Sequence, residues 1–482
     1  MSRQLDTAVD AAFASFQAGD LGGAAAACAE VLRKAPRNAR ALRLLGAVRL
    51  QGGDAQSASA LLDKAARLSP ADDRVHEDLA VAQLALGEYG AAERTLRRAL
   101  KLAARPRASL HARLAYALNG LERHDESEDA LRAALGLEPH MVALMMDLAN
   151  ALARRGAWSE ARTWFEQAAA AEPERPEAVF NLAVVLEREG RHEDAAQAYA
   201  EVITRFPTYH DAYINLGIVH EYLGRTDEAL RCYETALRID PASAHAYANL
   251  GKALRAAGRL DEAQAACLQA LRIAPAFSDA MVNLAGVLTD QGRAEEALAE
   301  YERALEIDPE AADAQFSYAA LNLALGRYEQ GWRSYAWRPT RLRARATQIE
   351  LDDRLPAKLE RSHILVLGEQ GLGDELFFLR YAAALQARGA HVHVECDPRL
   401  ATLLDRSGAF ESVTMPGQSR PLADHTYVAG DLPLLFLEAG HSDIPPPLAL
   451  SALESRVTSV RETLHRLGPP PYMGLTWAAG TP

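Results

Sequence analysis

Four asparagines recur at an interval of 34 residues in the middle of the chain. They are Asn181, Asn215, Asn249 and Asn283, and each stands in an apolar segment such as INLGIVHEYLGR. A carboxamide carries both a donor and an acceptor, so a row of such groups can pair with the main chain of a bound peptide whatever its side chains. The structural alternative is that asparagine tolerates a solvated helix face, or forms hydrogen bonds between adjacent repeats.

The asparagine row is confined to one part of the chain. Corresponding positions hold Asp78, Arg113 and Asp147 before it and Ser317 after it. A net hydrogen bond contributes about 0.5–1.5 kcal/mol, so four amides would give useful affinity with little sequence preference. The spacing therefore predicts a peptide-binding ladder in the second half of the repeating region.

A second group of chemically capable residues follows the apolar run HILVL at 363–367. The next residues, 368–374, read GEQGLGD, and this spacing differs from the dinucleotide fingerprint GxGxxG. Gly371 and Gly373 would let a ligand approach the backbone at the start of a helix, where free N–H groups favour an anionic or hydroxyl-rich ligand. Asp374 has two interpretations, as a helix-capping residue or as a general base for an acceptor hydroxyl.

The elements that carry the asparagines repeat every 34 residues. Prolines close the units at Pro36, Pro70, Pro139, Pro173, Pro207, Pro241, Pro275 and Pro309. The interval is 34 except from Pro70 to Pro139, where one extra residue enters near Pro106. Two apolar helices fill each unit, and a glycine joins them in every unit except at Glu122. Glycine supplies the left-handed turn, and proline stops the second helix.

This pattern resembles the tetratricopeptide repeat, a helix–turn–helix unit of 34 residues. The resemblance covers residues 5–338, as nine full units and a divergent tenth. It implies an α solenoid of tetratricopeptide repeats that binds an extended peptide or protein in its concave groove. The asparagine row is similar to the ladder that holds acceptor polypeptide in the repeats of O-GlcNAc transferase.

The last repeat leaves the pattern in an aromatic segment. Residues 325–339 read LGRYEQGWRSYAWRP and bring Trp332, Tyr335 and Trp337 close together. One interpretation is a capping helix whose aromatics cover the open end of the solenoid, and the other is a hinge that packs the repeats onto the next domain. Residues 339–361 are rich in charged residues and predict a linker.

Beyond the linker the pattern changes to alternating strands and helices. The run at 363–367, the helical segment after it and the run HVHVEC at 391–396 form one βαβ unit, for which a parallel sheet is expected. Short strands near 412–415 and 426–429, helices at 431–439 and 451–467, and a last strand at 472–477 complete the expectation. Residues 362–470 are thus predicted to form a Rossmann-like α/β domain.

The segment ILVLGEQGLGDELFFLRYAAALQARG resembles the start of the heptosyltransferase-like glycosyltransferases. That resemblance implies half of a GT-B fold, with Glu369, Gln370, Gly371 and Gly373 in the acceptor cleft and Asp374 as the candidate base. It implies a nucleotide-sugar donor, sugar transfer to a hydroxyl, and no metal.

In this family a second domain holds the donor. Residues 471–482 match only the beginning of such a domain, so we expect no cofactor on this chain alone and no turnover. The alternative function is a non-catalytic interaction scaffold with a relic lobe.

Composition narrows the remaining possibilities. The formal net charge is −13, which disfavours non-specific nucleic-acid binding. The N-terminus lacks the apolar core of a signal peptide, and no run of about 18 apolar residues predicts a membrane span. Cys28, Cys232, Cys267 and Cys396 lack the CxxC spacing of a zinc or disulfide framework, so reduced thiols and a cytoplasmic location are expected. The oligomeric state is left open.

Overall fold

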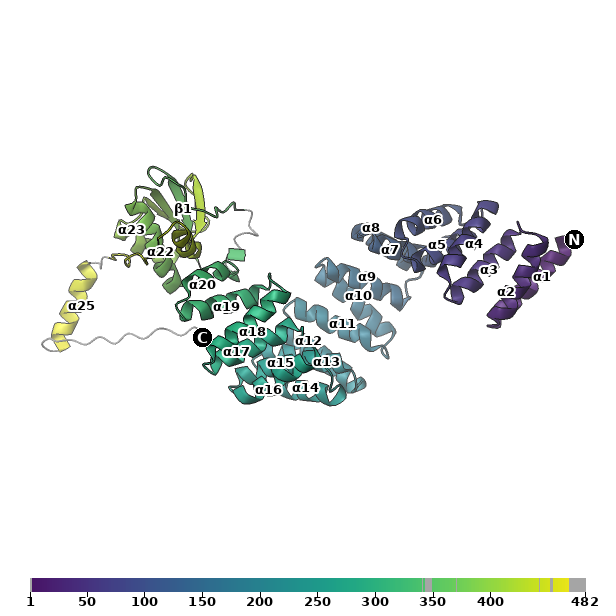
Figure 1. The fold of residues 1–482 in the computed structure, drawn as a ribbon, viewed down its shortest axis with the longest axis horizontal. Coiled ribbons are helices and arrows are strands. Elements are labelled where there is room, and N and C mark those ends of the chain that lie inside the picture. The colour runs from purple at the N-terminus through teal and green to yellow at the C-terminus, as the bar shows by residue number, and fades with distance from the viewer. Residues whose placement is uncertain are drawn as a thin grey trace. The chain divides into compact units, whose positions relative to one another are not determined.

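A computed structural model describes residues 2–339, 341–342, 349–369, 371–441, 443–450 and 454–467. They divide into two compact units, Met1–Pro241 and Ala242–Pro482, each of which is described by itself. The first unit is helical throughout, and the second begins with helices and ends in an α/β lobe (Figure 1). None of the described helices combines the length and the apolarity that crossing a membrane would require.

The first unit is a stack of helix pairs. The first helices are α1(Ser2–Gln17), α3(Ala39–Gln51), α5(Asp73–Ala85), α7(Ala108–Gly120), α9(Val142–Arg154), α11(Pro176–Arg188) and α13(His210–Tyr222). The second helices are α2(Leu21–Lys34), α4(Ala55–Leu68), α6(Tyr89–Leu102), α8(His124–Leu137), α10(Trp158–Ala171), α12(His192–Arg205) and α14(Thr226–Ile239). Each pair packs on the next, so the apolar faces are buried between neighbours.

Glycines explain both the turns and the close packing of these pairs. Gly190 has φ 75° between α11 and α12, whereas Glu122 takes the same left-handed conformation at φ 60° with a side chain attached. A Cβ added to Gly217 would lie only 2.5 Å from Cε1 of Tyr233, so the helices α13 and α14 approach closely there. The small residues of the repeat therefore set the distance between paired helices.

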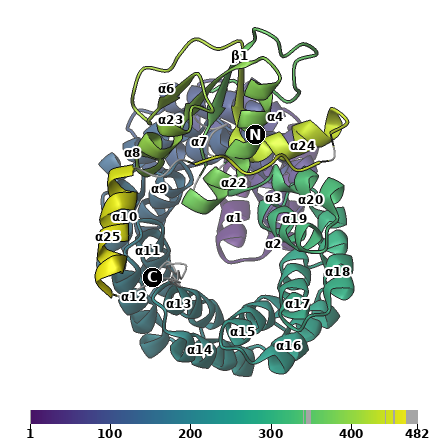
Figure 2. The same cartoon turned by 90° about the vertical axis from the view of Figure 1, so that its left-hand side faces the viewer.

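Three more pairs open the second unit. They are α15(Ala244–Ala256) with α16(Leu260–Ile273), α17(Ser278–Asp290) with α18(Ala294–Ile307), and α19(Ala312–Ala324) with α20(Tyr328–Tyr335). The first helices α15, α17 and α19 contact one another and lie on the inner side of this stack, with α16, α18 and α20 outside (Figure 2). The segment predicted as a divergent tenth repeat thus forms a complete helix pair with a short second helix.

The lobe at the end of the second unit contains a four-stranded parallel sheet in the order β3-β2-β1-β4. Its elements are β1(His363–Leu367), α22(Leu372–Ala387), β2(His391–Glu395), α23(Pro398–Ser407), β3(Ser412–Thr414), β4(His425–Val428), η1(Ala429–Asp431), α24(Leu432–Glu438) and α25(Glu454–Leu467). Ile364 is paired with Val392 on one side and with His425 on the other. The predicted parallel sheet is confirmed, and the strand predicted at 472–477 lies outside the described residues.

The aromatics at the end of the solenoid pack against this lobe. Trp332 and Tyr335 lie beside the lobe core, each with its ring centroid 6.0 Å from that of Phe378. The interpretation of this segment as the packing surface between the repeats and the next domain is therefore correct. These aromatics cover the end of the solenoid by joining it to the lobe, because α20 supplies the apolar face that the lobe core needs.

The cysteines behave as core residues. Cys28, Cys232, Cys267 and Cys396 are all free thiols in the structure. Burial raises the pKa of Cys28, Cys232 and Cys396 to about 11 and that of Cys267 to about 12. Thiols with such pKa values remain protonated at neutral pH, so these residues are poor nucleophiles.

Candidate functional site

The four ladder asparagines lie at one position of four first helices. Asn181 is on α11 and Asn215 on α13 in the first unit, whereas Asn249 is on α15 and Asn283 on α17 in the second. Each is half-buried, so its carboxamide lies at the boundary between the packed layer and solvent. The structure gives these four amides two different environments.

Asn215 and Asn283 form hydrogen bonds with the preceding repeat. Asn215 Nδ2 donates to Tyr199 Oη at 3.2 Å, and that hydroxyl lies 3.3 Å from Glu187 Oε2, to which it donates. Burial raises the pKa of Tyr199, so its phenol keeps the proton that it donates. Asn283 Nδ2 donates to the carbonyl oxygen of Ala248 at 3.1 Å. The structural interpretation of the row therefore applies to these two amides, whose donor groups are occupied.

Asn181 and Asn249 differ from them. Within the part of the chain that the structure describes, neither carboxamide forms a hydrogen bond with another protein group. Both amides can therefore offer a donor and an acceptor to a ligand. Identical residues at identical repeat positions thus serve different purposes, and the side chain that each one faces decides which.

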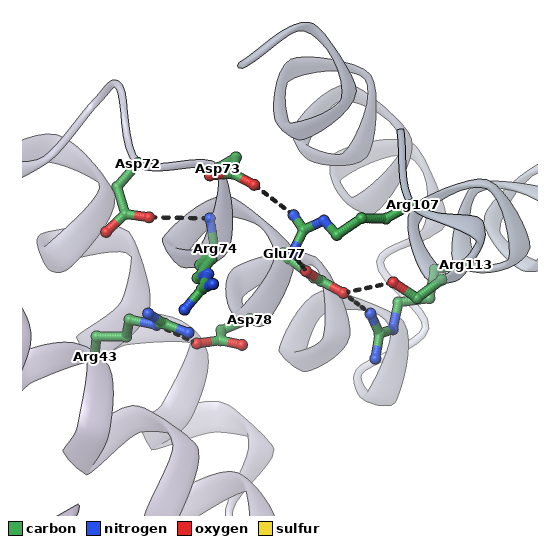
Figure 3. A network of polar contacts seen from close by, with 9 residues as sticks. Arg43, Asp72, Asp73, Arg74, Glu77, Asp78, Arg107 and Arg113 are labelled. Atoms are coloured by element: carbon green, nitrogen blue, oxygen red, sulfur yellow. Dashed lines mark hydrogen bonds and ion pairs between the residues drawn. The ribbon is translucent and has the colours of Figure 1, made fainter. Parts of the chain in front are cut away.

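The earlier ladder positions belong to a network of ion pairs in the first unit (Figure 3). Asp78 Oδ2 on α5 accepts from Arg43 Nε on α3 at 2.5 Å, and Arg113 on α7 is paired with Glu77 on α5. Arg107 Nη1 also lies 2.8 Å from Glu77 Oε2. These charges hold three successive first helices together, so their side chains are committed to one another.

A pocket of about 550 Å³ follows this network in the first unit. Residues of α7, α9 and α11 line it, and α8 and α10 form its floor. Its polar lining residues are Asn119, Ser127, Asp147, Asn150, Arg154, Asn181 and Arg188, and its aromatic ones are Tyr116, Trp158 and Phe165. Asn181, one of the two unbonded ladder amides, therefore stands in the wall of a pocket that the neighbouring repeats build.

Sequence reasoning missed most of this pocket. The search for one recurring residue type found Asn181 but not Arg154 and Arg188, although these also differ by 34 and each ends a first helix. Asn150 corresponds to Tyr116 one repeat earlier, so no residue type is shared there. A comparison of chemical class at each repeat position would have found the arginine pair.

The glycine-rich turn lies where β1 ends and α22 begins. Gly371 is the N-cap of α22 with φ 100°, and Asp374 lies in the first helical turn with its side chain exposed. A Cβ on Gly373 would meet no atom within 4 Å, so this face is open. Gln370 lies outside the described residues. Asp374 is therefore accessible at the positive end of a helix dipole, and its role as a base stays a prediction.

Glu369 faces the last repeat. Its carboxylate accepts from Arg338 Nε at 2.8 Å and from the backbone N–H of Gly430 at 2.9 Å. Arg338 Nη1 also lies 2.8 Å from Asp431 Oδ1, and Arg341 Nε lies 2.7 Å from Asp431 Oδ2. The Arg338 and Glu369 side chains are only 2% and 4% exposed. This carboxylate is thus engaged in a buried cluster, and its proposed contact with an acceptor stays a prediction.

Glu375 is a further candidate that sequence reasoning did not single out. Its side chain is buried, and its Oε1 accepts from the backbone N–H of Asp397 at 3.0 Å. Burial raises the pKa of Glu375 to about 7, and the charges of Asp397 and Glu369 act in the same direction. A carboxyl with this pKa can both take and release a proton near neutral pH. Its position beside Asp374 at the end of the turn was the available signal.

The described residues include no group of three or more His, Cys, Asp or Glu side chains arranged to hold a metal ion. The metal independence that the resemblance implied stays a prediction.

Family models match the repeating region almost without interruption. A tetratricopeptide repeat model matches residues 10–73, 112–171, 146–210 and 214–276, and a second one matches 49–114 and 254–303. A third model, described as TPR repeat, matches 285–326. No curated protein matches the chain.

Several solved structures are similar to parts of the chain. A thermophilic tetratricopeptide repeat protein from Thermus thermophilus is 28% identical and covers 38% of this chain and 99% of its own, with a TM-score of 0.34. A repeat protein from Parabacteroides merdae is 17% identical over 50% of this chain and 94% of its own, with a TM-score of 0.44. YrrB, described as having an unusual peptide-binding site, is 20% identical over 39% and 96%, with a TM-score of 0.32.

Proposed function

Because this chain is a tetratricopeptide repeat protein, with repeats matched between residues 10 and 326, we propose that it binds an extended polypeptide along the first helices of its repeats. Such repeats mediate protein–protein interactions, and their stacked first helices offer a long continuous surface. The proposal names the ligand as a peptide main chain because the side chains on this surface include unbonded carboxamides.

One observation carries the proposal. The carboxamide of Asn181 lies in the wall of a pocket of about 550 Å³ without a hydrogen bond to any described residue. Asn150, one helix earlier, supplies a second carboxamide to the same pocket. A peptide group that crosses the pocket could accept from one amide and donate to another, as two strands of a sheet do. Each such bond would contribute about 0.5–1.5 kcal/mol net.

The test compares the free amides with the bonded ones. A 12-residue peptide selected from a random display library on the full chain serves as the probe. Replacing Asn181 and Asn249 together by alanine should weaken its binding five- to tenfold, because two main-chain contacts are lost. The same pair of changes should leave thermal unfolding nearly unchanged, since neither amide bonds to a described protein group. Fluorescence polarisation measures the affinity.

The matched control replaces Asn215 and Asn283 by alanine. These changes remove the bonds to Tyr199 and Ala248, so they should lower the free energy of unfolding by about 1–2 kcal/mol. If the variant that lacks Asn181 and Asn249 loses stability but keeps its peptide affinity, the whole row is structural and the proposal is wrong.

We also propose a role for the lobe. The parallel sheet, the positive φ of Gly371 and the exposed Asp374 support an acceptor-side lobe similar to that of heptosyltransferase-like enzymes, with a nucleotide-sugar as the donor. In this proposal Asp374 takes the proton of the acceptor hydroxyl, and the peptide held by the repeats carries that hydroxyl. The alternative is a docking lobe without catalysis, and the commitment of Glu369 to the buried cluster favours it.

Sugar transfer decides between these two roles. The chain is incubated with UDP-, GDP- and CMP-sugars and a hydroxyl-bearing probe peptide, whose mass is then measured. We expect an unchanged mass, which supports the docking role. Transfer by the wild-type chain that Asp374→Asn abolishes at equal peptide affinity would establish the catalytic role instead.

A location in the cytoplasm completes the proposal. The four free thiols support a reducing compartment. The net charge of −13 supports a protein or peptide partner over nucleic acid.

A further inference from the structure

Two arginines at the ends of successive first helices line the same pocket. Arg154 is the last residue of α9 and Arg188 the last residue of α11. Arg154 Nη2 donates to Asn119 Oδ1 at 3.3 Å. Across the described residues, neither guanidinium has a carboxylate within ion-pair distance. Both charges are exposed to solvent at the pocket and remain available to a ligand.

Neighbouring arginines show that this is not the general state of the array. Arg155 follows Arg154 directly, and its guanidinium lies 3.4 Å from Asp125 Oδ1 and 3.2 Å from Glu128 Oε2. Arg162, on α10, lies 3.1 Å from Glu189 Oε2. Arginines that face other surfaces of these repeats are thus neutralised within the protein, whereas the pair at the pocket is not.

The pocket is therefore locally positive within an acidic protein. Its lining holds the two guanidinium groups and a single carboxylate, that of Asp147. A planar guanidinium binds a carboxylate through two parallel hydrogen bonds, which are stronger than neutral ones. The two arginines belong to adjacent repeats, so one acidic group can approach both.

Aromatic side chains lie beside the arginines in the same lining. Tyr116 is 59% exposed, which is unusual for so large an apolar surface, and Trp158 is half-buried. Flat aromatic faces give contact area with little loss of side-chain freedom. They suit apolar groups that flank a charged residue in a peptide.

The carboxylate is expected to come from a side chain and not from a chain terminus. The first unit continues on both sides of the pocket, with α5 before it and α13 after it. A polypeptide can therefore pass through the pocket, with no wall to stop its end. The ladder amide Asn181 lies in the same pocket and would hold the main chain of that segment.

We propose that Arg154 and Arg188 form a subsite for an Asp or Glu side chain of the bound polypeptide, with Tyr116 and Trp158 contacting the apolar groups beside it. This subsite deepens the proposed function and rests on it, because it assumes that a peptide occupies the first-helix surface.

The experiment starts from random 12-residue peptides displayed on phage and selected on the full chain. Peptides recovered by the wild-type protein should be enriched in Asp and Glu, and those recovered by Arg154→Gln/Arg188→Gln should not. For one recovered peptide, replacing its acidic residue by the isosteric amide should weaken binding to the wild type at least tenfold. The same peptide change should have little effect on the double variant. Arg155→Gln is the matched control, because it removes an adjacent arginine that is already ion-paired.

Three results would overturn the subsite, and they are distinguishable. Equal affinity for the acidic peptide and its amide would exclude recognition of a carboxylate while leaving peptide binding intact. A loss of affinity on amidation of the peptide C-terminus, and not on the side-chain change, would assign the pocket to a terminal carboxylate. Failure to recover any peptide would overturn the proposed function together with the subsite. Circular dichroism of the double variant shows whether its helices are intact.

Discussion

Three carboxylates within seven residues of the lobe experience three environments. Glu369 is paired with Arg338 in a buried cluster, Asp374 is exposed at the start of α22, and Glu375 is buried without a cationic side chain bonded to it among the described residues. An ion pair offsets the cost of burying a charge, whereas burial without one favours the protonated form. Residue type alone therefore does not predict the charge of this turn.

Glu375→Gln should remove a pH dependence of lobe stability. Since the pKa of Glu375 rises from 4.5 to about 7 on folding, its contribution is fully present below pH 4.5 and is lost as the pH rises through about 7. The wild-type lobe should thus lose on the order of 3 kcal/mol between pH 4.5 and 8, and the glutamine variant much less. The free energy of opening of β1, from amide hydrogen exchange corrected for intrinsic rates, measures this.

The matched control for this change is Asp374→Asn, which alters the neighbouring, exposed carboxylate. A pH dependence that persists in Glu375→Gln, or disappears in Asp374→Asn, would show that another group is responsible. The glutamine can still accept the hydrogen bond from Asp397, so the variant tests the charge and leaves the contact in place.

The helix α20 and the segment after it attach the lobe to the repeats. Trp332 and Tyr335 contribute apolar contacts with the lobe core, and Arg338 contributes ionic contacts with Glu369 and Asp431. A buried ion pair is weak support for stability by itself, yet removing one partner leaves an uncompensated charge. The tenth repeat is therefore as much part of the lobe as of the solenoid.

Arg338→Ala should destabilise the lobe by about 3–5 kcal/mol, because Glu369 and Asp431 lose the cation between them. Amide hydrogen exchange should accelerate in β1 and β4, while α15 and α17 keep their protection. Arg333→Ala is the control. The Arg333 guanidinium pairs with Glu329 at the surface, and exposed pairs contribute about 1 kcal/mol or less. Equal effects of the two changes would contradict a structural role for the buried cluster.

At the scale of the whole molecule, a long array of similar repeats carries local differences. The total charge is −13, but the pocket of the first unit carries two guanidinium groups and one carboxylate. At about 0.15 M salt, charges separated by more than about 8 Å are largely screened, so a ligand at the pocket responds mainly to these nearby groups. A globally acidic protein can therefore select an acidic segment.

The sequence by itself determined the repeats, the helix on which each ladder asparagine lies and the parallel sheet of the lobe. These features depend on periodicity and on neighbours along the chain, which a sequence displays directly. Only the tertiary structure decided that, among the described residues, Asn215 is bonded to Tyr199 while Asn181 is free, and that Arg154 and Arg188 lack ion-pair partners. Hydrogen bonds and burial depend on distances between different helices, and a repeat pattern does not contain those distances.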